Sequence, residues 1–348
     1  MPKPITGTIS GSRASAILGF SKYTTPFSVW QDIMEEREPG FNQKNGYDYQ
    51  PFEGNAATRF GHAFESAAIE ITELKTGKKI VDQEKIYKKK IGVVNTSCHI
   101  DGRLSGTKSM YEGKTSYERG FNLNWGDPGT DKIPREYHGQ AQHNMYLSGC
   151  EETVFSVLVF PRTPFEWEEM GFVAEHPEEC FGNFTIAKFE GSEFKYRFDP
   201  KKWAFPLSEM GYHHIYRVKL NDQLISKMHE KYREFWESYV LTGTPPKPMN
   251  VDDIKKLIPN PAGTIVIKNS FLIKTLKEYT EITKEIGGSG ILSKRKEQLK
   301  TVFLDRVRKQ IPVADEESTD KWIFLDEQGN KLGSWGKNKN GTFILYTN

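Results

Sequence analysis

Three charged residues, Asp101, Glu112 and Lys114, lie within fourteen positions of one another in the segment HIDGRLSGTKSMYEGKTS. This segment, residues 99–116, is typical of a hairpin with its turn at residues 105–106. Successive residues of a strand alternate between its two faces, so Glu112 and Lys114 point the same way. The short turn allows Asp101, on the preceding strand, to face Glu112. The three side chains are therefore expected to converge on one point.

The chemistry expected at such a point is phosphodiester hydrolysis assisted by a metal ion. Two carboxylates can bind a hard divalent cation such as Mg²⁺, which takes oxygen ligands, and the backbone carbonyl of Gly113 could supply a further oxygen. A lysine beside the ion would lower the pKa of an attacking water or stabilise the charge that develops on the phosphorane. The alternative is a solvated surface hairpin with a Glu–Lys pair, because this spacing is common by chance.

Glu65 is a third candidate carboxylate, and it lies in a helix predicted from TRFGHAFESAAIEI. Gly61, Phe64, Ala68 and Ile71 form the expected buried stripe of this helix, and Glu65 lies at the edge of the stripe. An unpaired carboxylate is costly in such a place, and a nearby metal ion would offset the cost. A neighbouring basic side chain would offset it as well, so both interpretations stay open.

A later helix, predicted from IPREYHGQAQHNMYLSG, carries a candidate polar pair. Gln142 and Tyr146 are four positions apart and share one face of the helix, which is expected to face the sheet. Gln140 and His143 are expected to point elsewhere. A glutamine facing the sheet could hold a water or a scissile phosphate without adding charge. The alternative is a polar helix with a buried tyrosine.

The N-terminal segment ISGSRASAIL offers a candidate anion site. Ser10 or Ser12 begins a predicted helix, where free backbone N–H groups attract anions, and Arg13 could add a charge-assisted contact to a phosphate. The alternative is that the serine is only the N-cap of the helix, for which serine is a preferred residue.

The elements predicted around these residues imply an α/β fold. A helix, three strand-like segments and a second helix lead up to the buried strand ETVFSVLVF, and this succession indicates a central mixed sheet flanked by helices. We assign this core to a domain over residues 1–248, with an irregular insertion at about 161–211. Residues 249–348 form a C-terminal extension, with helices followed by a small β-meander.

The extension contains a basic helix with two interpretations. Its lysines and arginines could bind flanking nucleic acid or a protein partner. The alternative is an amphipathic helix that packs through four apolar residues, and both can hold at once with the basic residues outward. The apolar residues are Leu292, Leu299, Phe303 and Val307.

Composition sets the broad class of the protein. The chain has 348 residues, of which 36% are hydrophobic and 27% charged, as in soluble globular proteins. No apolar run approaches the roughly 20 residues needed to span a bilayer, and no export signal is recognised, so no membrane partner is expected. Three cysteines without a C-x-x-C pair favour a reducing cytoplasm. The net charge of +2 demands no nucleic-acid partner, although basic runs at 85–90 and 293–300 could contact phosphates.

Taken together, the segments above resemble the YqaJ-type viral recombinase family, relatives of phage lambda exonuclease within the PD-(D/E)xK nuclease superfamily. The resemblance covers roughly residues 8–160 and 212–248. The chain departs from the family pattern at His99-Ile100, where a small residue and a proline are usual, and at Gly113, where an apolar residue is usual. The segments that carry the resemblance are ISGSRASAILGFSKYTTPFSVW, RFGHAFESAA, CHIDG, YEGKTS, IPREYHGQAQHNMYLSG and IYRVKLNDQLISKMHEKYREFWE.

The resemblance implies a catalytic centre with a PD-(D/E)xK fold around it. Asp101 and Glu112 would be metal ligands, and Glu65 would complete the acidic site directly or through a metal-bound water. Lys114 would be the catalytic lysine that orients or activates water. Gln142 would position the nucleophilic water or the phosphate.

The resemblance also implies residues that contact DNA. Ser12, with Arg13 beside it, would lie where the family reads a terminal 5′-phosphate. Tyr146 would belong with Gln142 to an element similar to the Q-x-x-x-Y element of the nuclease domains of bacterial recombination helicase-nucleases.

By the same resemblance, the protein would be a Mg²⁺- or Mn²⁺-dependent 5′-to-3′ exonuclease on linear double-stranded DNA, used in phage-type homologous recombination. Its partners would be duplex DNA with a free end, a single-strand annealing protein and further copies of itself, most often in a trimeric ring. It would work in the cytoplasm of a bacterial host and be encoded by the host or a phage. Two alternatives stay open: a structure- or sequence-specific endonuclease of the same superfamily, and a catalytically silent DNA-binding or scaffold protein.

Overall fold

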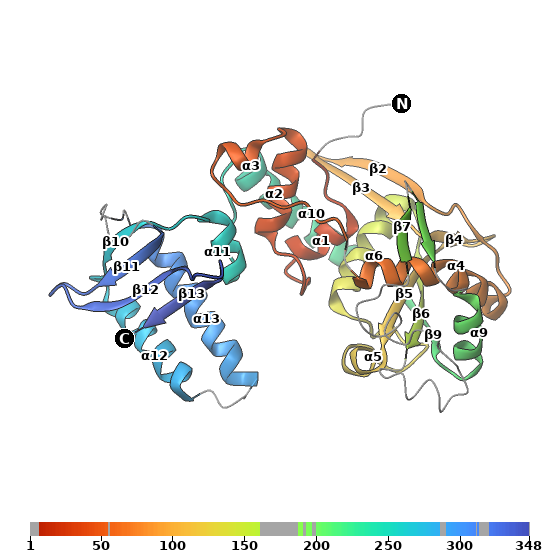
Figure 1. Cartoon of the computed structure of the whole chain (residues 1–348). Helices are drawn as coiled ribbons and strands as arrows, with labels where there is room; N and C mark the ends of the chain where they lie inside the picture. Colours follow the sequence, from red (N-terminus) through yellow and green to blue (C-terminus); the bar gives the residue numbers. More distant parts are fainter. Residues whose placement is uncertain are drawn as a thin grey trace. The chain divides into compact units, whose positions relative to one another are not determined.

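A five-stranded sheet forms the centre of the first part of the chain (Figure 1). Strands β5 and β6 run parallel and the other neighbours run antiparallel, so the sheet is mixed. The predicted α/β class with a central mixed sheet is confirmed. In spatial order the strands are β1 (Ile80–Val81), β4 (Gly102–Leu104), β5 (Ser109–Tyr117), β6 (Glu152–Phe160) and β9 (His213–Lys219).

The chain divides into two units, Met1–Thr24 with Pro51–Ser238, and Thr25–Gln50 with Tyr239–Asn348. The sequence suggested a boundary after residue 248, with residues 25–50 on the N-terminal side. In the structure the Trp30 indole N–H donates to the Tyr239 carbonyl over 3.0 Å, a contact within the second unit.

The structure is a computed structural model that describes residues 7–54, 56–160, 187–190, 193–196, 200–285, 290–310, 312 and 320–347.

Helices cover both faces of the central sheet, and the apolar residues of β6 alternate between them. Leu158 and Phe160 pack against α4 (Ala56–Thr76) and α9 (Lys201–Glu209). Phe155, Val157 and Val159 belong to the cluster on the opposite face, which contains residues of α6 (Arg135–Ser148). Burial on both faces explains why β6 is apolar along nearly its whole length. On the α6 side lie also α1 (Gly11–Ile17), α5 (Glu118–Asn124) and α10 (Asp222–Phe235), and a π-helical turn over Trp236–Val240 extends α10.

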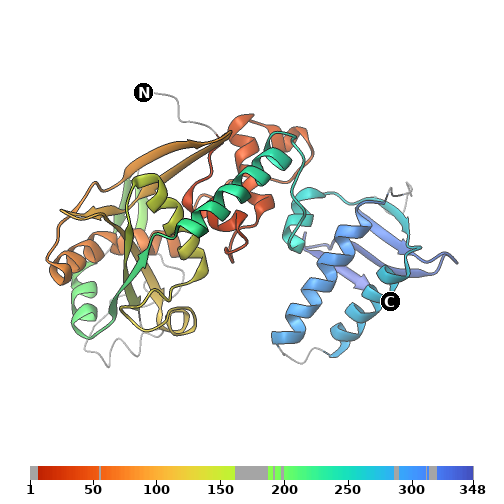
Figure 2. The ribbon, with the colours of Figure 1, turned by 180° about the vertical axis from the view of Figure 1, so that it is seen from behind.

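A separate two-stranded hairpin, β2 (Lys85–Ile91) and β3 (Val94–Ile100), precedes β4 (Figures 1 and 2). Ile9 lies along the other edge of β3, where its N–H donates to the Asn95 carbonyl over 2.9 Å and its carbonyl accepts from the Ser97 N–H over 3.0 Å. Because Asp101 directly follows β3 and precedes β4, this hairpin leads the chain into the predicted site.

The segment expected as an irregular insertion contains regular structure where it is described. The segments TIAKFEG and EFKYRF have the composition of strands, and they contain β7 (Ala187–Glu190) and β8 (Glu193–Tyr196), which pair with each other. Helix α9 was not predicted, and its buried residues Ala204 and Leu207 pack on the sheet. The rest of the expected insertion, residues 161–186, 191–192 and 197–199, lies outside the described residues.

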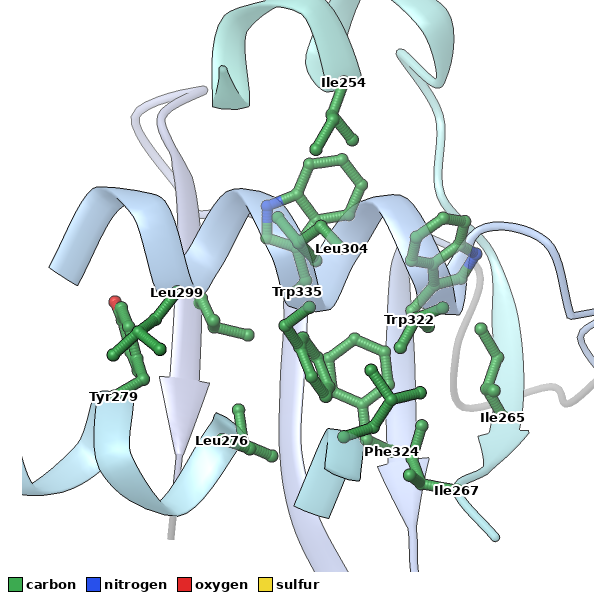
Figure 3. Packing of buried hydrophobic residues seen from close by; sticks show 14 of the residues in the cluster. Ile254, Ile265, Ile267, Leu276, Tyr279, Leu299, Leu304, Trp322, Phe324 and Trp335 are labelled. Atoms are coloured by element: carbon green, nitrogen blue, oxygen red, sulfur yellow. The ribbon is translucent and has the colours of Figure 1, made fainter. Parts of the chain in front are cut away.

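In the second unit a four-stranded sheet packs against helices around a core that contains Trp322, Phe324 and Trp335 (Figure 3). The predicted meander is confirmed as β11 to β13, and β10 joins its edge in parallel to β11. The elements of the second unit are α2 (Pro26–Arg37), α3 (Phe41–Lys44), α11 (Val251–Leu257), β10 (Gly263–Val266), α12 (Ser270–Glu285), α13 (Gly290–Val307), β11 (Lys321–Leu325), β12 (Lys331–Lys337) and β13 (Phe343–Thr347).

The basic helix of the extension is α13, and its apolar side packs as predicted. Leu299, Phe303 and Val307 are buried in the core of the second unit, and the partly buried Leu292 packs against them. No helix in the described ranges is both long enough and apolar enough to cross a membrane.

Candidate active site

Strand β5 places Glu112 and Lys114 on the α6 face of the central sheet. In the parallel register, Glu112 lies beside Phe155 of β6 and Lys114 beside Val157, and these two apolar residues face α6. Tyr111, one position earlier, lies beside Val154 and belongs to a cluster on the α4 face. The alternation expected of a strand therefore brings the two charged residues together under α6, as the sequence predicted.

Glu112 is almost completely buried. Its side chain is 2% exposed, and that of Lys114 is 19% exposed. The Oε1 atom of Glu112 accepts hydrogen bonds from Lys114 Nζ over 2.6 Å and from Gln140 Nε2 over 2.9 Å. The Oε2 atom is buried and has no hydrogen-bond partner among the described residues. One carboxylate oxygen is thus satisfied by the protein, and the other is left for a ligand of positive charge or a proton.

Asp101 is held beside Glu112 by the backbone of β5. Its Oδ2 atom accepts a hydrogen bond from the Gly113 N–H over 2.9 Å. The predicted hairpin is confirmed, since Gly102 of β4 pairs with Tyr111 of β5. This pairing places Asp101 next to the peptide that follows Glu112.

The glycine at position 113 departs from the family pattern for a steric reason. A Cβ atom at this position would lie 2.9 Å from the hydroxyl oxygen of Tyr111, which is fully buried on the same face of β5. Any larger residue would therefore have to displace a buried tyrosine. The glycine and the tyrosine form a matched pair in this chain.

Burial and neighbouring charges shift the pKa values of Glu112 and Lys114. Burial, and then the negative charge of Asp101, raise the pKa of Glu112 from 4.5 to about 7, although Lys114 acts in the opposite direction. Burial disfavours the charged form of Lys114, but the carboxylates of Glu112 and Asp101 outweigh it and raise the pKa of the lysine. The site therefore holds a permanent cation beside carboxylates that compete for protons, which favours binding of a further cation.

Glu65 approaches the site from α4. Its side chain is 30% exposed and lies 3.5 Å from Nδ1 of His62. Burial, and next the charge of Asp101, raise the pKa of Glu65, so the two carboxylates interact electrostatically. Phe64, Ala68 and Ile71 are buried, as expected for the stripe that Glu65 borders.

The two glutamines of α6 are arranged opposite to the prediction. Gln140, expected to point elsewhere, is the residue that donates to Glu112. Gln142 is fully buried, and its amide group binds the backbone where β9 meets α10. Its Nε2 donates to the Lys219 carbonyl over 2.8 Å, and its Oε1 accepts from the Asn221 N–H over 2.8 Å. Gln142 therefore joins α6 to the adjoining chain and contacts neither Glu112 nor Lys114 through these bonds.

Helical spacing could have identified Gln140 through Tyr137. These two residues are three positions apart on α6 and share a face. Lys114 Nζ lies 5.1 Å from the centre of the Tyr137 ring, so the tyrosine and Gln140 cover the Glu112–Lys114 pair together.

Helix α1 supports Gln140 from behind. A Cβ atom on Gly11 would lie 2.5 Å from Asn144 Oδ1 and 2.9 Å from Gln140 Cγ. Gly139 of α6 approaches α1 equally closely, since a Cβ there would lie 2.7 Å from the hydroxyl oxygen of Ser15. The two glycines let α1 and α6 come close enough for α1 to fix the stem of Gln140.

The predicted DNA-contacting residues lie on two other surfaces. Ser12 is exposed on α1, with its hydroxyl 3.3 Å from that of Ser10, and Arg13 donates from NH1 to the Thr8 carbonyl over 2.8 Å. Tyr146 packs on His229 of α10, with ring centres 4.5 Å apart. Ser10 is the N-cap of α1 by position, but its side chain makes no capping hydrogen bond.

The donor atoms fit a hard divalent cation. A buried carboxylate oxygen without a partner and a second carboxylate beside it supply oxygen donors of the kind that Mg²⁺ prefers. Within the described residues, no group of three or more His, Cys, Asp or Glu side chains is arranged to hold a metal ion. The set therefore consists of Asp101 and Glu112, with Glu65 at its margin.

Comparison with known proteins identifies relatives of the first part of the chain. The chain is 30% identical over 165 residues to the uncharacterised protein YqaJ of Bacillus subtilis, a match that covers 47% of this chain and 46% of YqaJ. It thus spans about half the length of this curated relative.

Two solved exonucleases show a weaker likeness. An alkaline exonuclease from Laribacter hongkongensis has 14% sequence identity and a TM-score of 0.40 over 68% of this chain and 89% of the exonuclease. A phage-related exonuclease from Haemophilus somnus has 13% identity and a TM-score of 0.39, over 68% of this chain and 96% of its own.

Residues 6–151 of this chain match the YqaJ-like viral recombinase domain. This match confirms the family resemblance, and the matched residues include Glu65, Asp101, Glu112, Lys114 and Gln140.

Proposed function

We propose that the protein is a metal-dependent deoxyribonuclease, and specifically a 5′-to-3′ exonuclease on linear double-stranded DNA in phage-type recombination. The observation that carries this proposal is the buried Glu112, bonded to Lys114 and Gln140 through one oxygen and left without a partner at the other. A buried carboxylate with an unsatisfied oxygen is costly unless a ligand completes it. The match to the recombinase domain supports DNA as the substrate.

Asp101 and Glu112 would hold Mg²⁺ or Mn²⁺, with the Gly113 carbonyl as a further oxygen and Glu65 joined through a water. Such an ion, when bound, polarises a phosphoryl oxygen and lowers the pKa of a bound water. The raised pKa of Glu112 means that binding of the cation competes with a proton. Metal affinity should therefore increase as the pH rises through about 7.

The other residues of the site orient groups and balance charge. Lys114 stays protonated beside Glu112 and Asp101, so its ammonium group can stabilise negative charge on the phosphate. Gln140 fixes the rotamer of Glu112 through its amide N–H. We assign this positioning role to Gln140 in place of Gln142, whose amide is already used by the backbone.

We further propose the partners that the family resemblance implies. They are duplex DNA with a free end, a single-strand annealing protein that takes up the strand left behind, and further copies of the chain, most often in a trimeric ring. The bacterial cytoplasm is the proposed place of action.

The proposal is tested by offering linear and covalently closed circular duplexes of one sequence, in Mg²⁺ and in EDTA. We expect degradation of the linear duplex alone, only with metal, and its loss in Asp101→Asn and Lys114→Ala. Glu151→Gln, a change at an exposed residue of a Lys108 ion pair, serves as the matched control and should cut normally. Cleavage of the circle would favour the endonuclease alternative. DNA binding without cleavage of either substrate would favour the silent scaffold.

A further inference from the structure

The β2–β3 hairpin presents a row of basic side chains that the proposed catalytic centre does not use. Strand β2 carries four exposed lysines in six positions, and no described strand pairs with its outer edge. Its inner neighbour β3 ends at Ile100, next to Asp101. The lysines are Lys85, Lys88, Lys89 and Lys90.

The lysines project from both faces of the hairpin. Lys88 and Lys90 are two positions apart on one face, which separates them by about 7 Å along the strand. Lys89 lies on the other face, where its ammonium group is 4.1 Å from the centre of the Tyr146 ring. The hairpin therefore carries positive charge on two sides of one edge strand.

The face of the hairpin that carries Lys89 is continuous with α10. His229 of α10 packs on Tyr146, and its pKa is lowered by burial and then by the charges of Lys89 and Arg233. Lys89 therefore lies on the ring of Tyr146, and the exposed Arg233 acts on the neighbouring imidazole, so this face of the hairpin carries positive charge that suits a phosphate backbone.

Few acidic residues oppose this charge. Asp82 lies 3.2 Å from Lys85, and Glu84 forms an ion pair with His99 on β3. In the described part of the chain, neither Lys88 nor Lys90 takes part in an ion pair. Two of the lysines are therefore available to a partner of opposite charge.

Lysines on an edge strand also hinder pairing with other chains, and this role is an alternative explanation. Glutamate would serve that purpose equally well, because any charged side chain blocks edge-to-edge pairing. A surface that binds an anion, by contrast, requires the positive sign. The two explanations can therefore be separated by reversing the charge.

We propose that the hairpin binds the phosphate backbone of the duplex whose end is cut at Asp101 and Glu112. This inference rests on the proposed function, since it assigns the path of the same substrate. The seven residues of β3, Val94–Ile100, span about 23 Å, so the hairpin reaches roughly two-thirds of a helical turn of B-DNA from the site. Contacts at Lys88 and Lys90 would hold duplex DNA that has not yet entered the catalytic centre.

The test is the salt dependence of DNA binding in EDTA, where no metal-dependent cleavage occurs. A fluorescently labelled linear duplex is titrated with the full chain and with the double variant Lys88→Gln/Lys90→Gln at several KCl concentrations. A plot of the logarithm of the DNA association constant against the logarithm of the salt concentration has a negative slope. Each lost phosphate contact makes this slope less steep by about 0.9, so loss of both lysines should make it less steep by about 2. Affinity near 0.1 M salt should fall by roughly 10- to 100-fold. Lys88→Glu/Lys90→Glu, which keeps edge charge, should bind more weakly still.

The control is Lys78→Gln/Lys202→Gln, at two exposed lysines, one just after α4 and one on α9. This variant should keep the wild-type slope and affinity. If the hairpin variants bind as tightly as the control, with the same slope, the hairpin proposal is wrong while the nuclease proposal stands. If the wild-type chain neither binds nor cuts the duplex, both proposals fail. Far-UV circular dichroism and the melting temperature confirm that each variant is folded.

Discussion

Replacing Glu112 by glutamine should stabilise the metal-free protein while abolishing the proposed activity. Glutamine keeps the shape of the side chain, and its carbonyl oxygen can still accept a hydrogen bond from Lys114. The change removes a buried negative charge. Burial, and then Asp101, raise the pKa of Glu112 to about 7, so the folded protein above this pH holds an ion that it disfavours.

The pKa difference sets both the size and the pH dependence of the effect. Between the ordinary value of 4.5 and about 7, the folded protein binds this proton more tightly than the unfolded chain does. The free energy of unfolding of the wild type therefore falls as the pH rises through this window. Integrated over the window, the loss is about 3 kcal/mol at pH 8 and about 1 kcal/mol at pH 5. Glutamine does not ionise, so Glu112→Gln does not lose this stability. Its free energy of unfolding should exceed that of the wild type by these amounts.

Scanning calorimetry in EDTA measures the difference directly. At pH 8 the melting temperature of the unit that contains the central sheet should be higher by roughly 6–12 °C in Glu112→Gln than in the wild type, and at pH 5 by roughly 2–4 °C. Glu151→Gln, at a residue that is 64% exposed, should change neither value by more than about 1 °C. A lower melting temperature for Glu112→Gln than for the wild type at pH 8, or an equal rise in melting temperature at both pH values, would refute the claim that burial disfavours the charged form of Glu112.

Three further predictions concern the way α6 supports the site. Gln140→Leu should lower kcat by about 10- to 100-fold with little change in KM, because it removes a hydrogen bond to a charged group worth about 1.5–3 kcal/mol. Gln142→Leu should instead lower the free energy of unfolding by about 1–3 kcal/mol, because it leaves the Lys219 carbonyl and the Asn221 N–H without their hydrogen-bond partner. The kcat of the folded variant should stay near that of the wild type. Equal losses of kcat in Gln140→Leu and Gln142→Leu would contradict the assignment. Gly11→Ala should cost about 1–3 kcal/mol in denaturant unfolding and also lower kcat, because its Cβ would displace the stem of Gln140; an unchanged kcat would show that α1 does not position this side chain.

Local periodicity was sufficient to predict the part of the site that lies on one strand. The two-residue repeat of β5 brings Glu112 and Lys114 to one face, and the short hairpin brings Asp101 beside them. The same kind of pattern predicted the buried strand β6 and the terminal meander. These features depend on neighbours in the sequence, which is where strand patterns carry information.

Features that depend on distant segments were not predicted. Helical spacing groups residues into faces, but it does not say which face of α6 meets Glu112. That choice is made by α1, through Gly11, and by the β9–α10 junction, whose backbone groups bind Gln142. The parallel pairing of β10 with β11 likewise joins segments that are separated by two helices.

The most direct test of the central claim is digestion of an end-labelled linear duplex, with and without a 5′-phosphate, in Mg²⁺ against EDTA. Wild type and Lys114→Ala are compared, and binding of Mn²⁺ to both is measured by calorimetry. We predict metal-dependent loss of the duplex from its 5′ ends by the wild type, and at least a hundredfold slower loss by Lys114→Ala, which still binds metal through Asp101 and Glu112. Equal rates in Mg²⁺ and EDTA, or full activity of Lys114→Ala, would contradict the assignment of this site.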